Sequence, residues 1–521
     1  MEKLDMSMEE ENKEKVHVTT DITITDYEQK IFDTLMEVRN LNKLNTIIRV
    51  NGGWVRDKML QKDCKDIDFA LDDISGAEFA AMLSAHLYPG QEHKFGVIKM
   101  NSEKSKHLET STMKVHDMFI DLVNLRSEEY ADDSRVPTIR IGTPLEDALR
   151  RDLTFNSMFY NINEKKIEDF TGKGIDDLKF GIVRTPLDPL QTFIDDPLRV
   201  LRTIRFTTRF GFTMVDEIID AINNPKIKEY LASKVSFERI GKETDLMFEG
   251  ENPADSIKYF YDFQIFSHIL KFPESCAELK DEEFVNEQTY VSLKVSQVLG
   301  ILIKDIKKDP KFLSAEWPKD GEFKEMQKYL FYSAILVPFK DYIYTFKKGS
   351  KSKTEKVHGY VMYESLKQPN KGKIFSTACL ESLDSMITLV NSPFDVLKVG
   401  CVVKDLGEYI KPVLLLSLAT EYYRDYLADK SQDIDRTSLG EVIAKYTGFY
   451  ESMKEHKIEN AHLIQPLMNG KAIMELYKIK GGPLIKKLTD EVFKWQVEHP
   501  DGTLEELKAY MLANRDIFAQ G

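Results

Sequence analysis

The chain has 521 residues, too many for one hydrophobic core, because single domains usually hold about 100–200 residues. Apolar residues make up 42% of the chain and charged residues 30%, which excludes a largely disordered protein. The 72 basic and 86 acidic side chains give a net charge of −14, which excludes a protein that binds nucleic acid over its whole surface. No uninterrupted apolar run reaches the ~18 residues of a membrane span. The four scattered cysteines indicate reduced thiols in an intracellular protein rather than a disulfide framework or a zinc site.

The first residues are acidic, with five carboxylates in the first eleven positions. This composition fits neither a signal peptide nor an Arg-rich, acid-poor mitochondrial presequence. We therefore expect residues 1–25 to form a disordered acidic tail.

Short β-rich runs alternate with helical stretches between about residues 45 and 185. The pattern predicts a strand over 46–50, a helix after a Gly-Gly turn, a strand over 66–71, a helix over 76–87 and an alternating strand run over 114–125. From about residue 190 the apolar spacing is helical, as in 483–495, where Pro483 marks a helix start. We therefore expect an α+β fold, in which a small mixed sheet with helices precedes an all-helical remainder.

The strand over 66–71 carries two carboxylates, Asp66 and Asp68. Residues i and i+2 of a strand share a face, so these carboxylates repel each other unless a cation lies between them. Mg²⁺ prefers such oxygen ligands, and a carboxylate pair can hold two ions that activate a hydroxyl and neutralise a leaving pyrophosphate. A pair of solvated acids on an edge strand is the alternative for an isolated D-x-D.

A glycine turn and an arginine precede this strand. Gly52 and Gly53 stand between a strand and a helix, where backbone N–H groups can point at a phosphate. Arg56, in the first helical turn, is placed to bind a triphosphate as a planar fork. Together with the carboxylates, this arrangement within residues 46–71 favours a nucleotide site.

Two further blocks are rich in arginine. In DALRRDLTFN (147–156), neighbouring helical arginines diverge by ~100°, so we expect one of Arg150 and Arg151 to bind sugar or phosphate and the other to pair with Asp147 or Asp152. Asn156 either supports this region or lies on a helix surface. In the helical run 194–210, arginines recur at 199, 202, 205 and 209 beside an apolar stripe; a solvated helix face is the alternative to a binding row.

The second block also contains a pair suited to reading a base edge, Asp196 and Arg199. Cytosine and adenine each present an amino group beside a ring acceptor, which a carboxylate and a guanidinium can match. Uracil and guanine reverse this pattern, and each mismatched buried group costs ~1–3 kcal/mol. Two mismatches would give a discrimination of roughly a hundredfold or more.

The spacing of GGWVRD and DIDFA resembles that of the class II tRNA nucleotidyltransferases, within the DNA polymerase β-like superfamily. The resemblance covers about residues 45–260. It implies that Asp66 and Asp68 are catalytic metal ligands and that Asp121 is a candidate third carboxylate, with a structural acid bonding backbone or Arg126 as the alternative. It also implies a set of nucleotide-binding residues: Gly52, Gly53, Arg56, Arg151, Asp152, Asp196, Arg199, Arg202 and Arg205.

Other segments fit the same family. Asp195 replaces the family's usual Glu at the front of the base-selecting motif. Residues 169–186 resemble its flexible linking motif, and in 235–250 we expect Glu238, Arg239 and Glu243 to brace the neck. The run 103–112 resembles a loop of the fungal CCA-adding enzymes. The implied organisation is a nucleotidyltransferase head over 26–188, a helical neck over 189–265 and a tRNA-binding body and tail over 266–521.

The resemblance implies addition of C, C and A to the 3′ end of tRNA from CTP and ATP, with two Mg²⁺ ions and no template. Implied partners are the tRNA acceptor arm and 3′ end, with no DNA and no membrane, and we expect a monomer or weak dimer. We expect a cytoplasmic and nuclear location; mitochondrial delivery from an alternative start at Met6 or Met8 stays open. A poly(A) polymerase and a catalytically idle RNA-binding protein are the alternatives. For RNA binding the sequence offers Lys347, Lys348, Lys351 and Lys353, which a solvated charged loop would explain equally well.

Overall fold

The computed structural model describes residues 16–64, 67–90, 95–98, 110–129 and 138–519. The chain divides into two compact units, Met1–Thr244 and Asp245–Gly521. The division into head, neck, and body with tail is finer than this and stays a prediction. None of the helices in the described ranges is long and apolar enough to cross a membrane.

The N-terminal unit is built on a seven-stranded mixed sheet with the order β3-β4-β5-β2-β1-β8-β9. The pairing of β2 with β5 is parallel, whereas β1 pairs antiparallel with both β2 and β8. The strands are β1 (Ile48–Asn51), β2 (Ile67–Leu71), β3 (Phe95–Ile98), β4 (Thr110–Val115), β5 (Met118–Asn124), β8 (Phe159–Asn161) and β9 (Lys166–Glu168). Two smaller ladders join β6 (Arg126–Glu129) to β7 (Thr138–Ile141) and β10 (Ile182–Val183) to β11 (Thr213–Met214).

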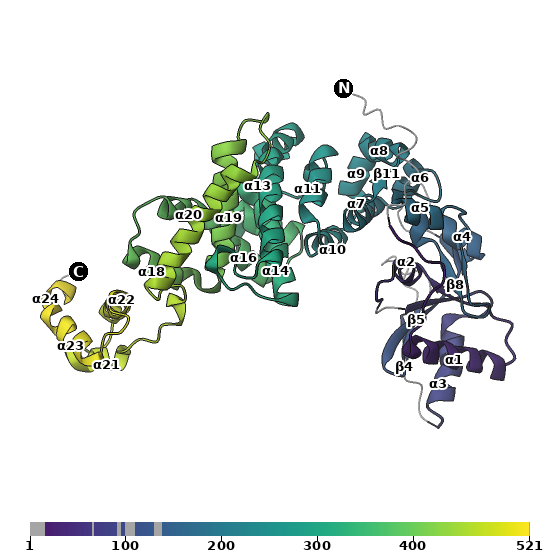
Figure 1. The fold of residues 1–521 in the computed structure, drawn as a ribbon, viewed down its shortest axis with the longest axis horizontal. Coiled ribbons are helices and arrows are strands. Elements are labelled where there is room, and N and C mark those ends of the chain that lie inside the picture. The colour runs from purple at the N-terminus through teal and green to yellow at the C-terminus, as the bar shows by residue number, and fades with distance from the viewer. Residues whose placement is uncertain (1–15, 65–66, 91–94, 99–109, 130–137, 520–521) are drawn as a thin grey trace. The chain divides into compact units, whose positions relative to one another are not determined.

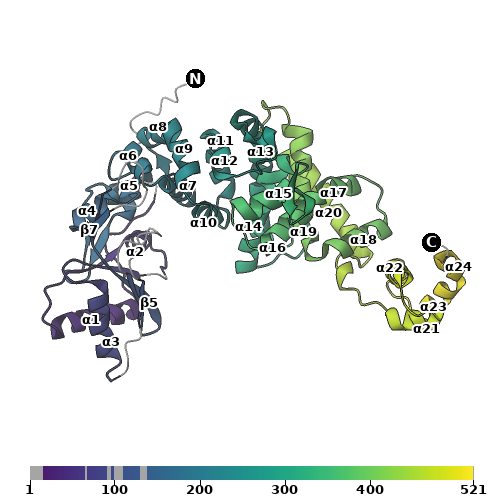
Figure 2. The same ribbon diagram turned by 180° about the vertical axis from the view of Figure 1, so that it is seen from behind.

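Two helices, α1 (Asp26–Leu41) and α3 (Gly76–Leu87), lie together against this sheet (Figures 1 and 2). Each begins at a capping box, in which a Thr or Ser side chain and a Glu three residues later satisfy the first amide groups. Phe32 of α1 contacts Phe69 of β2 edge to face, with ring centroids 5.9 Å apart. Ile67, Phe69 and Leu71 are buried on this face, so the alternating side chain of Asp68 points to the other.

Further helices complete the N-terminal unit, and the last of them, α10, runs past the end of this unit at Thr244. Helix α7 begins after Pro197 and ends at Gly211, which has the positive φ of a helix C-cap. The helices are α2 (Gly53–Met59), α4 (Pro144–Leu149), α5 (Gly174–Phe180), α6 (Pro189–Asp195), α7 (Leu198–Phe210), α8 (Asp216–Asn223), α9 (Pro225–Lys234) and α10 (Phe237–Phe248). The segment 169–186, expected to be a flexible link, is folded here: Asp169 accepts hydrogen bonds from three backbone amides, and α5 and β10 follow.

One predicted strand is wrong in detail. The run 114–125 forms parts of two antiparallel strands, β4 and β5, joined by a tight turn at His116 and Asp117. His116 has φ +52°, the left-handed conformation that a turn requires. The alternating pattern continued through the turn because both arms of a hairpin have a period of two.

The C-terminal unit is mostly helical, as predicted, with one exception. Strands β12 (Ile343–Lys348) and β13 (Lys351–Lys356) form an antiparallel hairpin, so the expectation of an all-helical remainder is wrong at this point. The alternation of Ile343–Lys348 was hidden among lysines and threonines. The longer helices are α11 (Pro253–Asp262), α13 (Glu282–Lys308), α14 (Asp320–Leu336), α16 (Asn370–Glu381), α17 (Leu383–Val390), α18 (Val396–Leu406), α19 (Ile410–Tyr422) and α20 (Arg436–Glu455).

The last helices have a hydrophobic cluster of their own. They are α21 (Gly470–Tyr477), α22 (Pro483–Glu498), α23 (Leu504–Ala513) and α24 (Arg515–Ala519). Leu488, Val492 and Trp495 of α22 are buried in this cluster, which confirms the helix that the sequence predicted after Pro483.

Candidate active site

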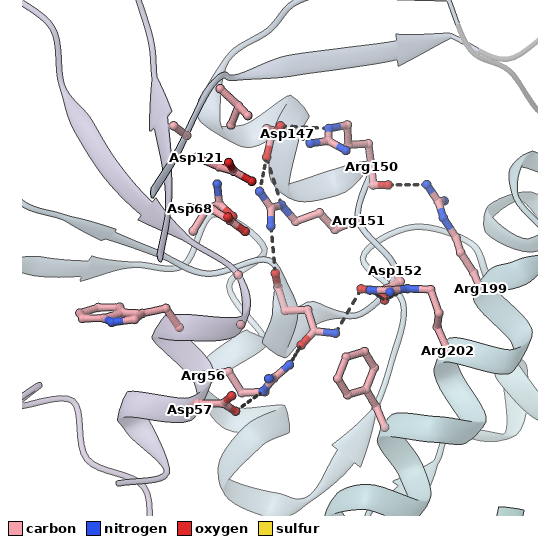
Figure 3. A pocket seen from close by; sticks show the side chains of 18 of the residues that line it. Arg56, Asp57, Asp68, Asp121, Asp147, Arg150, Arg151, Asp152, Arg199 and Arg202 are labelled. Carbon is pink, nitrogen blue, oxygen red and sulfur yellow. Dashed lines mark hydrogen bonds and ion pairs between the residues drawn. The ribbon is translucent and has the colours of Figure 1, made fainter. Parts of the chain in front are cut away.

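A cavity of about 760 Å³ opens in the N-terminal unit, on the face of the sheet that carries Asp68 (Figure 3). Its described lining includes nine arginines and six aspartates. They come from β2, β5, β6, α2, α4 and the segment after it, the residue after α6, α7 and α10. The excess of guanidinium groups makes the cavity suited to a polyanion such as a nucleoside triphosphate.

Two carboxylates lie side by side at the wall of the cavity. Asp68 of β2 and Asp121 of β5 are direct partners in the parallel ladder, and both line the cavity. Thr112 of β4, opposite Asp121, donates a hydrogen bond of 2.5 Å to its carboxylate. Hard oxygen donors on neighbouring strands fit Mg²⁺. Asp66 lies outside the described residues, and no group of three or more His, Cys, Asp or Glu suited to a metal occurs within them.

The glycine turn connects β1 to α2 at the edge of the cavity. Gly52 has φ +62°, a conformation that favours glycine, and a Cβ atom there would lie 2.9 Å from Nη1 at the end of the Arg151 side chain. Its amide donates to the carbonyl of Met158, at 3.1 Å. The expectation that both glycine amides are available to a phosphate is therefore wrong for Gly52.

Arg56 is buried, at 4% exposure, yet it lines the cavity. Its Nε donates to Asp57 at 2.8 Å and its Nη1 to the Asn156 side chain at 2.5 Å. The guanidinium also lies about 5 Å from the ring centroids of Phe206 and Phe210 of α7. Asn156 is thus not on a helix surface but holds Arg56 in place.

Arg150 and Arg151 both pair with one carboxylate. Asp147, 2% exposed, accepts from Arg150 on one oxygen, at 2.5 Å, and from Arg151 on the other, at 2.7 Å (Figure 3). Burial alone would raise the pKa of Asp147, but the two guanidiniums outweigh it and lower the pKa to about 2. Asp147 precedes Arg150 by three residues and Arg151 by four, the helical spacing at which both side chains can reach it, so the expectation that only one of them pairs with an acid is wrong. Arg151 also lines the cavity, and its role with sugar or phosphate stays a prediction.

Asp152 pairs with α7 instead. Its carboxylate accepts from Arg202 at 2.7–2.8 Å and from the Asn156 amide at 3.2 Å. Burial opposes ionisation, yet Arg202 and Asn156 lower the pKa of Asp152 to about 2. Asp152 therefore stays charged and fixes the arginine row of α7 to the segment after α4.

The two residues expected to read the base edge both line the cavity. Asp196 accepts two hydrogen bonds from Arg239 of α10, at 2.7 and 3.1 Å, so a bidentate pair orients its carboxylate. Arg199 donates to the carbonyls of Arg150, at 2.7 Å, and Thr192, at 3.3 Å. Both groups keep unused bonding positions, because a carboxylate has about four acceptor sites and a guanidinium five donors.

The arginine row of α7 is not a solvated helix face except at Arg209, which is exposed. Arg199 and Arg205 are each 9% exposed, and Arg205 pairs with Glu243 at 2.7 Å. Glu243 also lies 3.6 Å from Arg202, so it braces two of the arginines, as expected for the neck segment. Asp195, at the end of α6, accepts from Gln191 at 2.7 Å.

Several lining residues were not among the sequence candidates. Arg239 was expected only to brace the neck, and Asp57 and Phe206 complete the wall around Arg56. Glu128 of β6 lies between Arg126, Arg150 and Arg199, at 3.0–3.9 Å. The sequence spacing around Glu128 did not indicate its role. The one available signal was a surplus of arginines, which need a buried acid as a partner.

The lysines proposed for RNA contact lie on the β12–β13 hairpin of the C-terminal unit, not in a loop. Lys347, Lys351 and Lys353 are exposed, and the backbone of Lys348 pairs with that of Lys351. Within the described part of the chain, no carboxylate pairs with these three exposed lysines. Of the run 103–112 that resembles a fungal loop, residues 103–109 lie outside the described residues.

Known proteins resemble the chain along nearly its whole length. A family model described as the poly A polymerase head domain matches residues 48–184. The CCA tRNA nucleotidyltransferase, mitochondrial, of Candida glabrata is 34% identical over 518 residues, covering 94% of this chain and 96% of the relative. The enzyme of the same name from Saccharomyces cerevisiae is 31% identical, with 94% of each chain covered.

A solved structure shows the same fold. The Thermotoga maritima CCA-adding enzyme complexed with tRNA superposes with a TM-score of 0.60 at 18% identity, covering 94% of this chain and 96% of that one. At this identity the likeness concerns the fold alone. The similarity to the fungal enzymes extends over nearly the full length of the chain and shows the family as well as the fold. The chain belongs to the family of CCA tRNA nucleotidyltransferases.

Proposed function

We propose that the cavity of the N-terminal unit performs the reaction for which the family is named, the untemplated addition of C, C and A to the 3′ end of tRNA. The substrates are CTP and ATP, and each step forms one phosphodiester bond and releases pyrophosphate. The observation that carries the proposal is the Asp68–Asp121 pair at the wall of an arginine-rich cavity. Phosphoryl transfer needs such a site, because its catalysis is mainly positioning and neutralisation of charge.

Metal binding is assigned to the carboxylates. Asp66 and Asp68 would hold two Mg²⁺ ions, with Asp121 as a third ligand, and bound Mg²⁺ would supply activation of the 3′-hydroxyl and neutralisation of the leaving pyrophosphate. The alternative role for Asp121, bonding to backbone or Arg126, has less support, since its recorded partner is the Thr112 hydroxyl and it faces Asp68.

The remaining lining residues would bind the nucleotide. Gly53 and Arg56 would hold the triphosphate, with Arg56 already aligned by Asp57 and Asn156. Arg151 and Asp152 would contact the ribose side. Because Asp147 and Arg202 hold these two groups before substrate arrives, little ordering is left to the binding step.

Asp196 and Arg199 would read the base. The carboxylate would accept the amino group of cytosine or adenine, while the guanidinium would donate to the neighbouring ring nitrogen. Arg239 keeps the Asp196 carboxylate oriented for this role. Uracil and guanine would place an acceptor against the acid and a donor against the arginine, a mismatch of ~1–3 kcal/mol per group. Arg202 and Arg205 would act behind this pair by holding Asp152 and Glu243.

The tRNA would lie partly on the C-terminal unit, with the lysines of the β12–β13 hairpin as phosphate contacts. Exposed lysines can meet phosphates without reading sequence.

We propose a cytoplasmic and nuclear location, with mitochondrial delivery as a further one, since the names of both yeast relatives include the word mitochondrial. Fractionation of cells that express the tagged full chain would test all three.

One assay tests the reaction. Purified protein receives tRNA that ends at the discriminator base, Mg²⁺, and each nucleoside triphosphate singly and in mixtures. We expect two additions with CTP alone, three with CTP and ATP, and none with UTP or GTP. A long A tail from ATP alone would instead identify a poly(A) polymerase, which shares the matched head domain. No extension under any mixture would refute a catalytic role.

A further inference from the structure

An aromatic side chain lies exposed beside the catalytic carboxylates. Phe119 of β5 is 67% exposed, although β5 is an interior strand of the sheet. Its neighbours on the opposite face, Ile120 and Leu122, are 1% and 0% exposed and belong to the core. A large ring exposed on this face of an interior strand offers a flat apolar surface to a ligand from outside the sheet.

The register places Phe119 on the face that carries the carboxylates. Phe119 and Asp121 are two residues apart on β5, so they point the same way, about 7 Å apart along the strand. Across the ladder, Lys114 of β4 is the direct partner of Phe119, as Thr112 is of Asp121. The Lys114 side chain is half exposed and lies 3.4 Å from Asp117 in the hairpin turn. The face therefore continues beyond the carboxylates as an aromatic ring beside a cation.

Phe119 lies on the side of the carboxylates away from the nucleotide cavity. Further along β5, Asp121, Val123 and Asn124 line the cavity, whereas Phe119 does not. If the triphosphate fills the cavity, its α-phosphorus must lie close to Asp68 and Asp121. The attacking hydroxyl must then arrive opposite the leaving pyrophosphate, because the transfer is in line. The attacking hydroxyl can approach from the side of the carboxylates where Phe119 lies, because the triphosphate would occupy the other side.

We propose that Phe119 is the stacking platform for the terminal base of the tRNA, and that Lys114 meets the phosphate next to it. This inference rests on the proposed function and adds a primer-positioning residue to it. The three successive acceptor ends are the discriminator base, which differs between tRNAs, and then two cytosines. A hydrogen-bonding site could not hold all of these, whereas an aromatic face stacks any base.

The test compares substitutions at Phe119 in the full-length protein, with KM measured separately for tRNA and for CTP. Phe119→Ala should raise the KM for tRNA on the order of tenfold and leave the KM for CTP unchanged. Phe119→Tyr and Phe119→Trp should retain the wild-type KM, while Phe119→Leu should resemble alanine because it lacks a π face. Leu187→Ala removes another exposed apolar side chain of the same unit and is the matched control.

A second readout does not depend on turnover. In Phe119→Trp, the indole should be quenched when tRNA ending at the discriminator is added without nucleotide. The wild-type protein, with three tryptophans elsewhere, gives the background. Quenching should be stronger with a purine than with a pyrimidine discriminator, since purines stack over a larger area.

Three results would overturn the inference. They are an unchanged KM for tRNA in Phe119→Ala, a leucine variant equal to the aromatic ones, and a lowered unfolding midpoint in Phe119→Ala with no effect on tRNA, which would mean that the ring packs against this chain. The wild-type products are scored first. If wild type does not build CCA, the proposed function fails; if it does and Phe119→Ala is normal, only this inference fails.

Discussion

The cavity of the N-terminal unit and the β12–β13 hairpin of the C-terminal unit are both rich in cations, but the cations are held in opposite ways. In the cavity they are arginines, and Asp147, Asp152, Asp196 and Glu243 fix their positions. On the hairpin, Lys347, Lys351 and Lys353 are exposed, and no carboxylate in the described part of the chain pairs with them; Lys356, at the end of β13, lies 3.7 Å from Asp341. Fixed guanidiniums suit one defined ligand geometry, whereas free ammonium groups suit any phosphate.

The cavity also shows why the net charge says little about the site. Its described lining holds nine arginines and six aspartates, so it is locally basic although the chain as a whole is acidic. Local arrangement, not the net charge of −14, sets the field that a substrate meets. Five experiments would break or sharpen the contrast between the two regions, and they are ordered by the expected size of the effect.

The largest effect should come from the carboxylates. Asp68→Asn should lower kcat on the order of a thousandfold or more, because an amide cannot neutralise Mg²⁺ as a carboxylate does. Asp66→Ala should behave in the same way. CTP binding, measured by equilibrium dialysis without Mg²⁺, should be retained, because the arginines remain. Full activity of either variant would show that the metal assignment is wrong.

Asp147, which pairs with Arg150 and Arg151, should contribute to the free energy of unfolding. Asp147→Ala leaves Arg150 and Arg151 without their shared partner, and removal of one member of a buried pair costs about 3–5 kcal/mol. Urea denaturation measures the loss in the free energy of unfolding. Glu229→Ala, an exposed acid of α9, is the control and should change it by less than about 0.5 kcal/mol. Equal free energies of unfolding for wild type and Asp147→Ala would show that pairing with Asp147 does not stabilise the arginines of the cavity.

Base selection should depend on Asp196 and Arg199. Replacing both Asp196 and Arg199 by Ala should reduce the preference for CTP over UTP by roughly a hundredfold, because both mismatches that reject uracil disappear. The ratio of kcat/KM for the two nucleotides measures this. Arg239→Ala should lower the preference less, since it removes only the orientation of Asp196. A variant that loses activity equally for both nucleotides would contradict a role in selection.

Acid should destabilise the N-terminal unit. The pKa of Asp147 and that of Asp152 are lowered to about 2 from an ordinary value of 3.8. Groups with a lowered folded-state pKa stabilise the fold above about pH 4, and this contribution is lost as the pH falls toward 2. Each carboxylate contributes ~2 kcal/mol by this linkage. Urea titrations between pH 5 and 2 should show wild type losing more stability than Asp147→Ala; parallel curves would contradict the assignment.

The smallest effect should come from the hairpin. Replacement of Lys347, Lys351 and Lys353 by Gln should raise the KM for tRNA several-fold and leave the KM for CTP unchanged. The dependence of log K on log salt should also become shallower, since fewer counterions are released. Replacement by Arg keeps the charge and should preserve both values. An unchanged salt dependence would show that the hairpin does not contact RNA.

Much of the molecule was predictable from local patterns. Helix α3 has the predicted bounds, Gly76–Leu87, and the alternation in β2 placed Phe69 in the core and Asp68 on the other face. The Gly-Gly turn and the arginine row of α7 also occur where the spacing indicated. These features depend on periods of 2 and 3.6 residues, which any short segment carries within itself.

The sequence by itself therefore determined the family, the order of the elements and the chemical types of the site residues. Only the tertiary structure decided which charged side chains form ion pairs with each other. Asp196 and Arg239 are 43 residues apart, and Asp152 and Arg202 are 50 residues apart. It also decided that the lysines at 347–353 lie on a hairpin and that Phe119 stands beside the carboxylates. Side-chain periodicity is local, whereas the partner of a buried charge depends on where the chain turns back and which strand becomes its neighbour.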